Sequence, residues 1–285
     1  MSDPQDIAAW WSSKPMTYGR QHGAADYEGG VRELGSRAFF EAADDKFYAW
    51  NRPLHDARPF GRLFPYEEYR GKAVLEIGCG MGAMAMNWAR AGARLTAVDL
   101  TDVAVEQTRR RFALFGLDGD IRQADARSLP FAAASFDYVY SWGVLHHSPD
   151  LARSIDEAMR VLRPGGGFGF MLYHRHSLLY LYMVRFLEGF LHYENRFLSP
   201  LELASRYGDG GREEGNPHTW PITRSEAQTL FAPYSRDLAV RVFGTDLEGV
   251  VPFVVPGVGA RLPLWCKKVW ARRFGWSLWI HGHKG

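Results

Sequence analysis

The chain has 285 residues, of which 46% are hydrophobic, and its formal net charge is +2. This composition excludes a disordered or collagen-like chain and provides enough apolar residues for a sizeable core. The nearly balanced charge argues against a strongly basic nucleic-acid-binding domain. The two cysteines, Cys79 and Cys266, are too few for a disulfide framework or a four-thiolate zinc site, and no metal is expected.

Neither an export signal nor a membrane span is evident in the sequence. The N-terminal region contains charged residues and no apolar run of the length that a signal peptide needs. The longest apolar stretch, residues 178–191, is too short to cross a bilayer and is predicted to be a buried or interfacial helix. It contains Arg185 and Glu188, which are spaced to pair on one helix face. Together with the low cysteine content, these features predict a cytoplasmic protein.

Residues 1–70 lack an alternation of strands and helices but contain many aromatic residues between Gly and Pro breaks. They predict a helical, aromatic-rich N-terminal extension. From residue 73, short apolar runs alternate with helix-length segments, a pattern typical of a parallel sheet with crossover helices. The expected strands are 73–77, 94–98, 120–124, 136–140 and 167–173, and the expected helices are 82–91, 102–115 and 151–162.

Beyond residue 173 the pattern is less regular. The apolar helix is followed by a stretch rich in Gly, Asn and Pro at 208–221, which predicts a long loop. A short helix at 224–231, a sixth strand at 237–243 and a last strand at 275–281 complete the expected elements. We therefore expect four segments, namely an extension or lid (1–70), a core (71–173), a cap or insertion (174–234) and C-terminal strands that complete the sheet (235–285).

The first apolar strand of the core runs directly into a glycine-rich turn. Gly78, Gly80 and Gly82 allow a tight turn and close approach of the backbone to a ligand. Asp99 ends the second expected strand, where a carboxylate is suited to accept two hydrogen bonds from a ribose diol. In a parallel sheet both features meet at the carboxyl ends of the strands, which predicts a nucleoside-bearing cofactor.

The pattern Glu76-x-Gly78-x-Gly80-x-Gly82 resembles motif I of the class I S-adenosylmethionine-dependent methyltransferases. Asp99 lies where that family places the acid that binds the ribose hydroxyls, and Asp125 matches the acid beside the adenine amino group. Residues 136–147 look like the fourth strand of the family with its following loop, and residues 160–167 look like the turn before the fifth strand. The resemblance implies an α/β fold, a Rossmann-like, mostly parallel seven-stranded sheet with helices on both faces and a cap insertion after the fifth strand.

The resemblance also implies S-adenosylmethionine as cofactor and a set of residues that bind it: Glu76, Gly78, Cys79, Gly80, Gly82, Asp99, Leu100, Asp125, Ala126, Ser141 and Trp142. Cys79 is expected to pack against the turn and not to act as a nucleophile. The implied acceptor is a small, lipophilic or aromatic molecule, as in the ubiquinone, sterol and natural-product methyltransferases. The apolar helix and the N-terminal extension are candidates for a cap over that acceptor.

Methyl transfer requires a base only when the acceptor must lose a proton. Candidates follow the fourth and fifth strands, and among His146, His147, Tyr173, His174 and His176 we favour His147 or His174 as the catalytic base. Three further candidates, Tyr18, His22 and His218, lie in segments that sequence patterns do not place.

Three other functions remain open at this point. A nicotinamide-dependent oxidoreductase is compatible with Gly78, Gly80 and Ala83 in a GxGxxA pattern followed by Asp99. An RNA methyltransferase is disfavoured, because residues 141–144 lack the Asn/Asp-Pro-Pro-aromatic motif of enzymes that methylate base amino groups. The third is a cofactor-binding protein without catalytic activity. The acceptor atom and the oligomeric state do not follow from the sequence.

Overall fold

The structure, a computed structural model of the whole chain, describes residues 3–13, 33–208, 215–244 and 261–285. The chain forms two compact units. The first unit comprises Ala8–Ser141 and Asp156–Phe168, and the second comprises Met1–Ile7, Trp142–Ile155 and Gly169–Gly285. The division into four segments that we expect from the sequence stays a prediction. Tyr18 and His22 lie outside the described residues.

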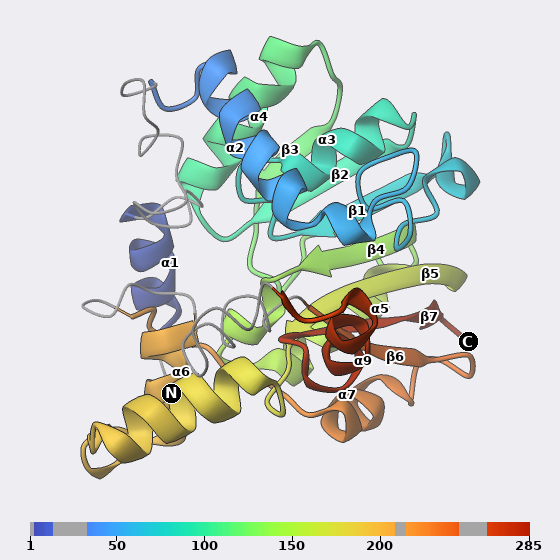
Figure 1. Ribbon diagram of the computed structural model, residues 1–285. Coiled ribbons are helices and arrows are strands. Elements are labelled where there is room, and N and C mark those ends of the chain that lie inside the picture. Colours follow the sequence, from blue (N-terminus) through green and yellow to red (C-terminus); the bar gives the residue numbers. More distant parts are fainter. Residues whose placement is uncertain (1–2, 14–32, 209–214, 245–260) are drawn as a thin grey trace. The chain divides into compact units, whose positions relative to one another are not determined.

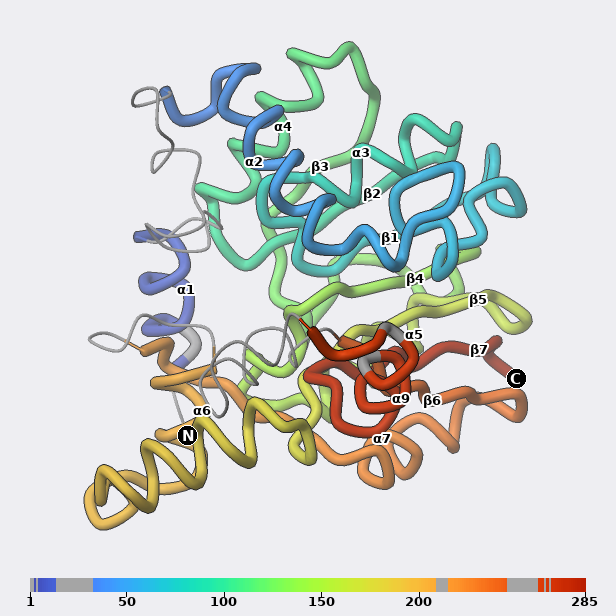
Figure 2. The backbone as a smooth tube through the Cα atoms, viewed as in Figure 1, coloured from blue at the N-terminus to red at the C-terminus, as the bar shows by residue number. Residues whose placement is uncertain are grey.

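Seven strands form one sheet in the order β3-β2-β1-β4-β5-β7-β6, which confirms the predicted fold class (Figure 1). The pairs β1–β2, β2–β3 and β1–β4 are parallel, and β6 and β7 are antiparallel. The tube in Figure 2 shows β7 between β5 and β6. The strands are β1 (Ala73–Ile77), β2 (Arg94–Asp99), β3 (Asp120–Gln123), β4 (Phe136–Trp142), β5 (Leu162–Tyr173), β6 (Ala239–Phe243) and β7 (Ser277–His283).

The inner strands of the first unit are apolar because both of their faces are covered. Val74 and Leu75 of β1 and Val139 and Tyr140 of β4 are all fully buried. The parallel register places Ile77 opposite Val98, so β1 and β2 end at the same edge. The glycine turn and Asp99 therefore meet there, as the sequence predicts.

The helical elements of the first unit agree with the predicted crossover segments. Thr101 caps α4 by accepting a hydrogen bond from the Ala104 amide at 3.3 Å, and Gly116 ends the helix in the left-handed conformation. Described helical elements up to residue 147 are α1 (Pro4–Ser13), α2 (Arg37–Trp50), η2 (Arg52–Leu54), η3 (Tyr66–Tyr69), α3 (Ala83–Arg90), α4 (Asp102–Phe115) and η4 (Leu145–His147).

The N-terminal extension is helical where it is described, and α2 is fixed to α3. The Tyr48 hydroxyl donates to the Ala83 carbonyl at 2.9 Å and accepts from the Asn87 amide at 3.1 Å. Burial raises the pKa of Tyr48, so this phenol stays protonated. Aromatic residues of the extension thus form part of the first unit.

The fifth strand differs from the prediction because it begins at Leu162 and not at residue 167. The amides of Ala134 and Ser135 bond the carbonyls of Arg160 and Val161 at 3.0 and 2.8 Å. These bonds satisfy the last carbonyls of α5, so the helix ends at Val161 and the strand begins before the Pro-Gly sequence that predicts a turn. The strand accordingly follows α5 directly.

Described helical elements after residue 150 are α5 (Leu151–Val161), η5 (Leu179–Leu191), η6 (Glu194–Arg196), α6 (Pro200–Gly208), α7 (Arg224–Phe231) and α9 (Leu264–Phe274). The sequence patterns do not predict α6 or α9. Their apolar positions are interrupted by charged residues, and α6 occupies the segment just before the expected loop.

The apolar stretch after β5 forms a π-helix, η5, in which the His192 amide bonds the Leu187 carbonyl at 3.0 Å. One side of η5 packs against α6 through a cluster that includes Val184 and Leu203 (Figure 1). The expected pairing of Glu188 with Arg185 gives way to a contact with His192 at 2.8 Å. The helix is thus buried on one side only. None of the helices in the described part of the chain is both long and apolar enough to cross a bilayer.

Replacement of Gly82 by alanine tests whether the glycine turn requires a residue without a side chain. Gly82 has φ +75°, and a Cβ there would lie 2.8 Å from Thr108 Cγ2, whereas Gly71 has φ +71° with nothing within 4 Å. We expect Gly71→Ala to lower the free energy of unfolding by about 1 kcal/mol through backbone strain alone. Gly82→Ala should cost about 2–3 kcal/mol because the contact adds to the strain. Urea unfolding measures both.

Thr108→Ser provides the control, since it removes Cγ2 and keeps a hydroxyl for the bond to the Gly80 carbonyl at 2.9 Å. In the Gly82→Ala background it should recover part of the lost stability. Equal losses for the two glycine variants would contradict the proposed crowding.

Candidate functional site

The turn after β1 is held in one conformation by backbone hydrogen bonds. The amides of Gly78 and Cys79 both donate to the Val98 carbonyl, at 2.8 and 3.0 Å, and the Gly82 amide donates to the Cys79 carbonyl at 2.8 Å. Gly78, Gly80 and Gly82 have φ values of +83°, +51° and +75°. Only glycine adopts such angles without strain, so the loop geometry explains the glycine spacing.

Asp99 is oriented by the backbone at the end of β2. Its Oδ2 accepts the Gly80 amide at 3.0 Å, and its Oδ1 accepts the amide and the hydroxyl of Thr101, each at 3.0 Å. Burial raises the pKa of Asp99, and the hydrogen bonds from Thr101 and Gly80 oppose that shift. The carboxylate is thus positioned by protein donors, as a preorganised site for ribose hydroxyls would require.

Glu76 is buried at the end of β1 and is only 2% exposed. Burial raises its pKa well above the usual value, although the Tyr140 hydroxyl and the Ala85 amide lower it. Its Oε2 has no partner with hydrogen-bond geometry. The carboxyl is therefore a buried acid beneath the turn, and a direct contact with the cofactor stays a prediction.

Cys79 is also buried, and its burial raises the pKa of the thiol well above the usual value. The Thr108 hydroxyl lies 3.5 Å from Sγ. Because a thiolate is disfavoured there, the geometry supports a packing role for Cys79 over a nucleophilic one.

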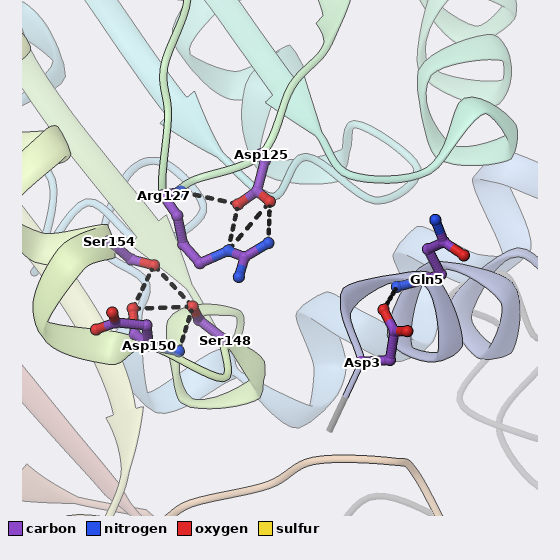
Figure 3. Close-up of polar contacts among 7 residues, drawn as sticks. All are labelled: Asp3, Gln5, Asp125, Arg127, Ser148, Asp150 and Ser154. Atoms are coloured by element: carbon purple, nitrogen blue, oxygen red, sulfur yellow. Dashed lines mark hydrogen bonds and ion pairs between the residues drawn. The ribbon is translucent and has the colours of Figure 1, made fainter. Parts of the chain in front are cut away.

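Asp125 follows β3 and is paired with Arg127 (Figure 3). The guanidinium donates through Nε to both carboxylate oxygens at 3.1 Å and through Nη2 to Oδ2 at 2.6 Å, and the Arg127 amide donates to Oδ1 at 2.8 Å. Partial burial raises the pKa of Asp125, but the bonds from Arg127 outweigh it and the net shift is downward. Sequence patterns do not indicate the role of Arg127, because an arginine in a loop is usually solvated.

The remaining predicted cofactor residues divide between the two units. Ser141 is buried and donates to the Ile77 carbonyl at 2.8 Å, which joins β4 to β1. The Leu100 carbonyl accepts from the Gln123 side chain at 2.9 Å, and Ala126 lies between Asp125 and Arg127. Trp142 belongs to the second unit, where its ring lies 6.0 Å from the rings of Phe243 and Trp279.

His147 lies in the second unit, and the partners of its ring define its tautomer. Nδ1 is 2.9 Å from the His218 carbonyl and 3.1 Å from the Thr219 hydroxyl. Thr219 donates its own proton to Asn216 Oδ1 at 2.7 Å, so its oxygen accepts from His147. Both partners therefore require a proton on Nδ1, and in the neutral ring Nε2 has the basic lone pair.

His174, the other predicted base, connects β5 to the segment before β7. Its backbone amide donates to the Trp276 carbonyl at 2.6 Å, and its Nδ1 lies 3.0 Å from the Gly275 carbonyl. Burial lowers the pKa of His174, which weakens it as a base. The contacts of this residue are those of a structural connection.

His146 is fully buried beside these groups, and neither of its ring nitrogens has a hydrogen-bond partner. Its ring lies 3.8 Å from the Tyr173 ring and 4.2 Å from the His147 ring, and Tyr173 in turn lies 4.3 Å from Trp276. Burial lowers the pKa of His146 well below the usual value. The second unit thus contains a neutral imidazole within an aromatic stack.

The geometry in the first unit, a glycine turn coupled to an acid at the end of the next strand, is typical of sites for nucleoside-bearing cofactors. Comparison with known families agrees, because a methyltransferase domain family matches residues 75–170. The ubiquinone biosynthesis O-methyltransferase of Nitrosococcus oceani is 30% identical over 186 residues, which cover 61% of this chain and 79% of that protein. The corresponding enzyme of Aromatoleum aromaticum is 32% identical over 173 residues, which cover 57% and 74%.

The chain belongs to the class I S-adenosylmethionine-dependent methyltransferases. Among solved structures, the [4+2]-cyclase SpnF has a TM-score of 0.56 at 17% identity and covers 100% of this chain and 97% of its own. A Pyrococcus horikoshii protein, PH0226, has a TM-score of 0.52 at 17% identity and covers 89% and 94%. At these identities the structures support the fold alone. The family assignment decides against a nicotinamide oxidoreductase and against a protein without catalytic activity.

Acid sensitivity of the fold tests the buried state of His146. Its folded-state pKa lies below the unfolded value of about 6.5, so the unfolded chain binds an additional proton below that pH. The contribution of His146 to the free energy of unfolding should be fully present above about pH 6.5. Below that pH it should fall by about 1.4 kcal/mol per pH unit. His146→Phe should reduce that slope, because it removes the titrating imidazole. The substitution removes no hydrogen bond, so other effects on the fold are small.

Urea unfolding between about pH 7 and about pH 5 measures the slope. An unaltered slope in His146→Phe would show that the imidazole binds its proton equally in the folded and the unfolded chain, which contradicts a lowered pKa.

Proposed function

We propose that the first unit binds S-adenosylmethionine through the glycine turn, with Asp99 at the ribose and Asp125 at the adenine amino group. When bound, the cofactor supplies a methyl group activated by a sulfonium. The residues fit this ligand, because the left-handed glycines keep the turn free of side chains and Asp99 is oriented by amides of the protein. Arg127 keeps Asp125 ionised and must share or release this carboxylate when adenine binds.

For the acceptor we propose a small, lipophilic or aromatic molecule with an ionisable hydroxyl, such as a phenol. The similarity to O-methyltransferases carries this proposal, and the tautomer of His147 fits it, because Nδ1 donates to the His218 carbonyl and the Thr219 hydroxyl and Nε2 is then the basic nitrogen of the neutral ring. A nitrogen of this kind can accept the proton of a hydroxyl group. A nucleophile that is already deprotonated does not need such a base. The names of the relatives, which methylate oxygen in ubiquinone biosynthesis, are consistent with it.

Aromatic rings surround this histidine in the second unit. Tyr173, His146 and Trp276 form a stack in which adjacent ring centroids lie 3.8 and 4.3 Å apart. The surroundings of His147 are thus aromatic and uncharged, which favours an aromatic or lipophilic acceptor over a charged one. We assign His174 a structural role, and neither a nucleic-acid partner nor a defined oligomer is part of the proposal.

His147→Asn tests the base without removal of the structural hydrogen bond, since the asparagine side-chain amide can replace Nδ1–H as donor to the His218 carbonyl. Turnover of a panel of phenols and hydroxyquinones, followed as S-adenosylhomocysteine release, should fall by about 10²–10⁴-fold in kcat.

The matched control is His174→Asn, which keeps an equivalent donor to the Gly275 carbonyl. Its kcat should stay within about threefold of the wild type, because removal of a group outside the chemistry leaves the transition state unaffected. A wild-type kcat in His147→Asn would exclude His147 as the base. Preferential methylation of amines over every phenol would exclude the proposed acceptor class.

A further inference from the structure

Helix α9 of the second unit presents an exposed surface composed of aromatic, aliphatic and basic side chains. Trp265, Val269 and Trp270 are 68%, 56% and 49% exposed. Lys268, Arg272 and Arg273 are exposed on the same helix. We call these six residues the α9 face. Such large exposed apolar side chains on one short helix indicate a binding surface, because scattered surface residues do not concentrate in this way.

The charge of this region has one sign. Residues 261–285 include lysines and arginines but no aspartate or glutamate. The exposed charges described on α9 are therefore cationic. Arg272 and Arg273 lie on the same side of the helix as Trp265 and Val269, and Lys268 and Trp270 flank that side. A partner that complements the face must combine negative charge with an apolar layer.

A second element of the same unit has a similar composition. On η5, Phe186 and Phe190 are 44% and 61% exposed. Their ring centroids lie 6.0 Å apart, and the Phe186 ring lies 5.8 Å from the Tyr182 ring. Arg185 is exposed next to Phe186, whereas the carboxylate of Glu188 is buried against His192. The exposed side of η5 therefore also combines aromatic rings with positive charge.

We propose that the second unit binds the surface of an anionic lipid bilayer through the α9 face, with the exposed side of η5 as a second contact. Tryptophan rings are favourable at the boundary between headgroups and acyl chains, and basic side chains beside them contact anionic headgroups. The exposed aliphatic Val269 beside the tryptophans favours an apolar layer over a nucleic acid, and RNA binding is a contrary outcome of the test below. The proposal is independent of the acceptor, although a lipophilic acceptor would be reached from such a surface.

Flotation of the full-length protein with vesicles tests the proposal. The wild type should float with phosphatidylcholine vesicles that contain phosphatidylglycerol and not with vesicles of phosphatidylcholine alone, and added salt should weaken the binding. Each basic residue near an anionic surface contributes about fivefold to partitioning, so Lys268→Gln/Arg272→Gln/Arg273→Gln should reduce it on the order of a hundredfold. Trp265→Ala/Trp270→Ala should reduce it at least about tenfold.

Matched variants exclude an effect of overall charge or of any exposed tryptophan. Lys72→Gln/Arg94→Gln/Arg236→Gln removes the same charge from exposed positions outside both helices, and Trp50→Ala removes a tryptophan that is 61% exposed on α2. Both should bind vesicles like the wild type. Circular dichroism and cofactor binding of each variant distinguish loss of the surface from loss of the fold.

Three outcomes would overturn the proposal. The first is equal flotation with neutral and anionic vesicles, and the second is anionic binding that the α9 variants leave unchanged. The third is evidence for a different partner of the α9 face. Such evidence would be salt-dependent binding of single-stranded RNA, or self-association in ultracentrifugation without lipid, if either is lost in the same α9 variants.

Discussion

The backbone amide of Gly80 donates to the carboxylate of Asp99, and through this bond the turn after β1 is joined to the end of β2. Its formation depends on the register in which Ile77 lies opposite Val98, because the same register brings the amides of Gly78 and Cys79 to the Val98 carbonyl. A shift of one residue would turn Asp99 to the other face of the sheet. The pairing of two buried strands thus determines where the proposed cofactor site forms.

Helix α4 supports this turn from a second direction. Thr108 donates to the Gly80 carbonyl at 2.9 Å and Arg111 donates to the Met81 carbonyl at 3.2 Å, and these two residues lie on one side of the helix. Arg111 is buried and also pairs with Asp44 of α2. Loss of one partner would leave a buried charge without compensation, which is strongly destabilising. The N-terminal extension is thereby connected to the turn and is not an independent appendage.

Much of the first unit could be predicted from the sequence, because its signals are local. Apolar runs define the strands, and the glycines that need positive φ angles mark the turn. The partners of His147 could not be predicted, since Thr219 is far away in sequence and the ring tautomer follows from a contact that only the fold creates. Helix α9 was also missed, because its exposed tryptophans and basic residues do not form an apolar stripe facing a core. The failures therefore concentrate in the second unit, where contacts are distant and surfaces are exposed.

The proposed cofactor site depends on Asp99, which is held by the turn and would bind the ribose of the cofactor. Calorimetric titration with S-adenosylhomocysteine tests it most directly in Asp99→Asn, with Asp102→Asn at the exposed start of α4 as the control. Hydrogen bonds to a charged group contribute about 1.5–3 kcal/mol each, so we expect Asp99→Asn to weaken binding at least about tenfold and Asp102→Asn to leave it unchanged. Wild-type affinity in a folded Asp99→Asn variant would contradict the account.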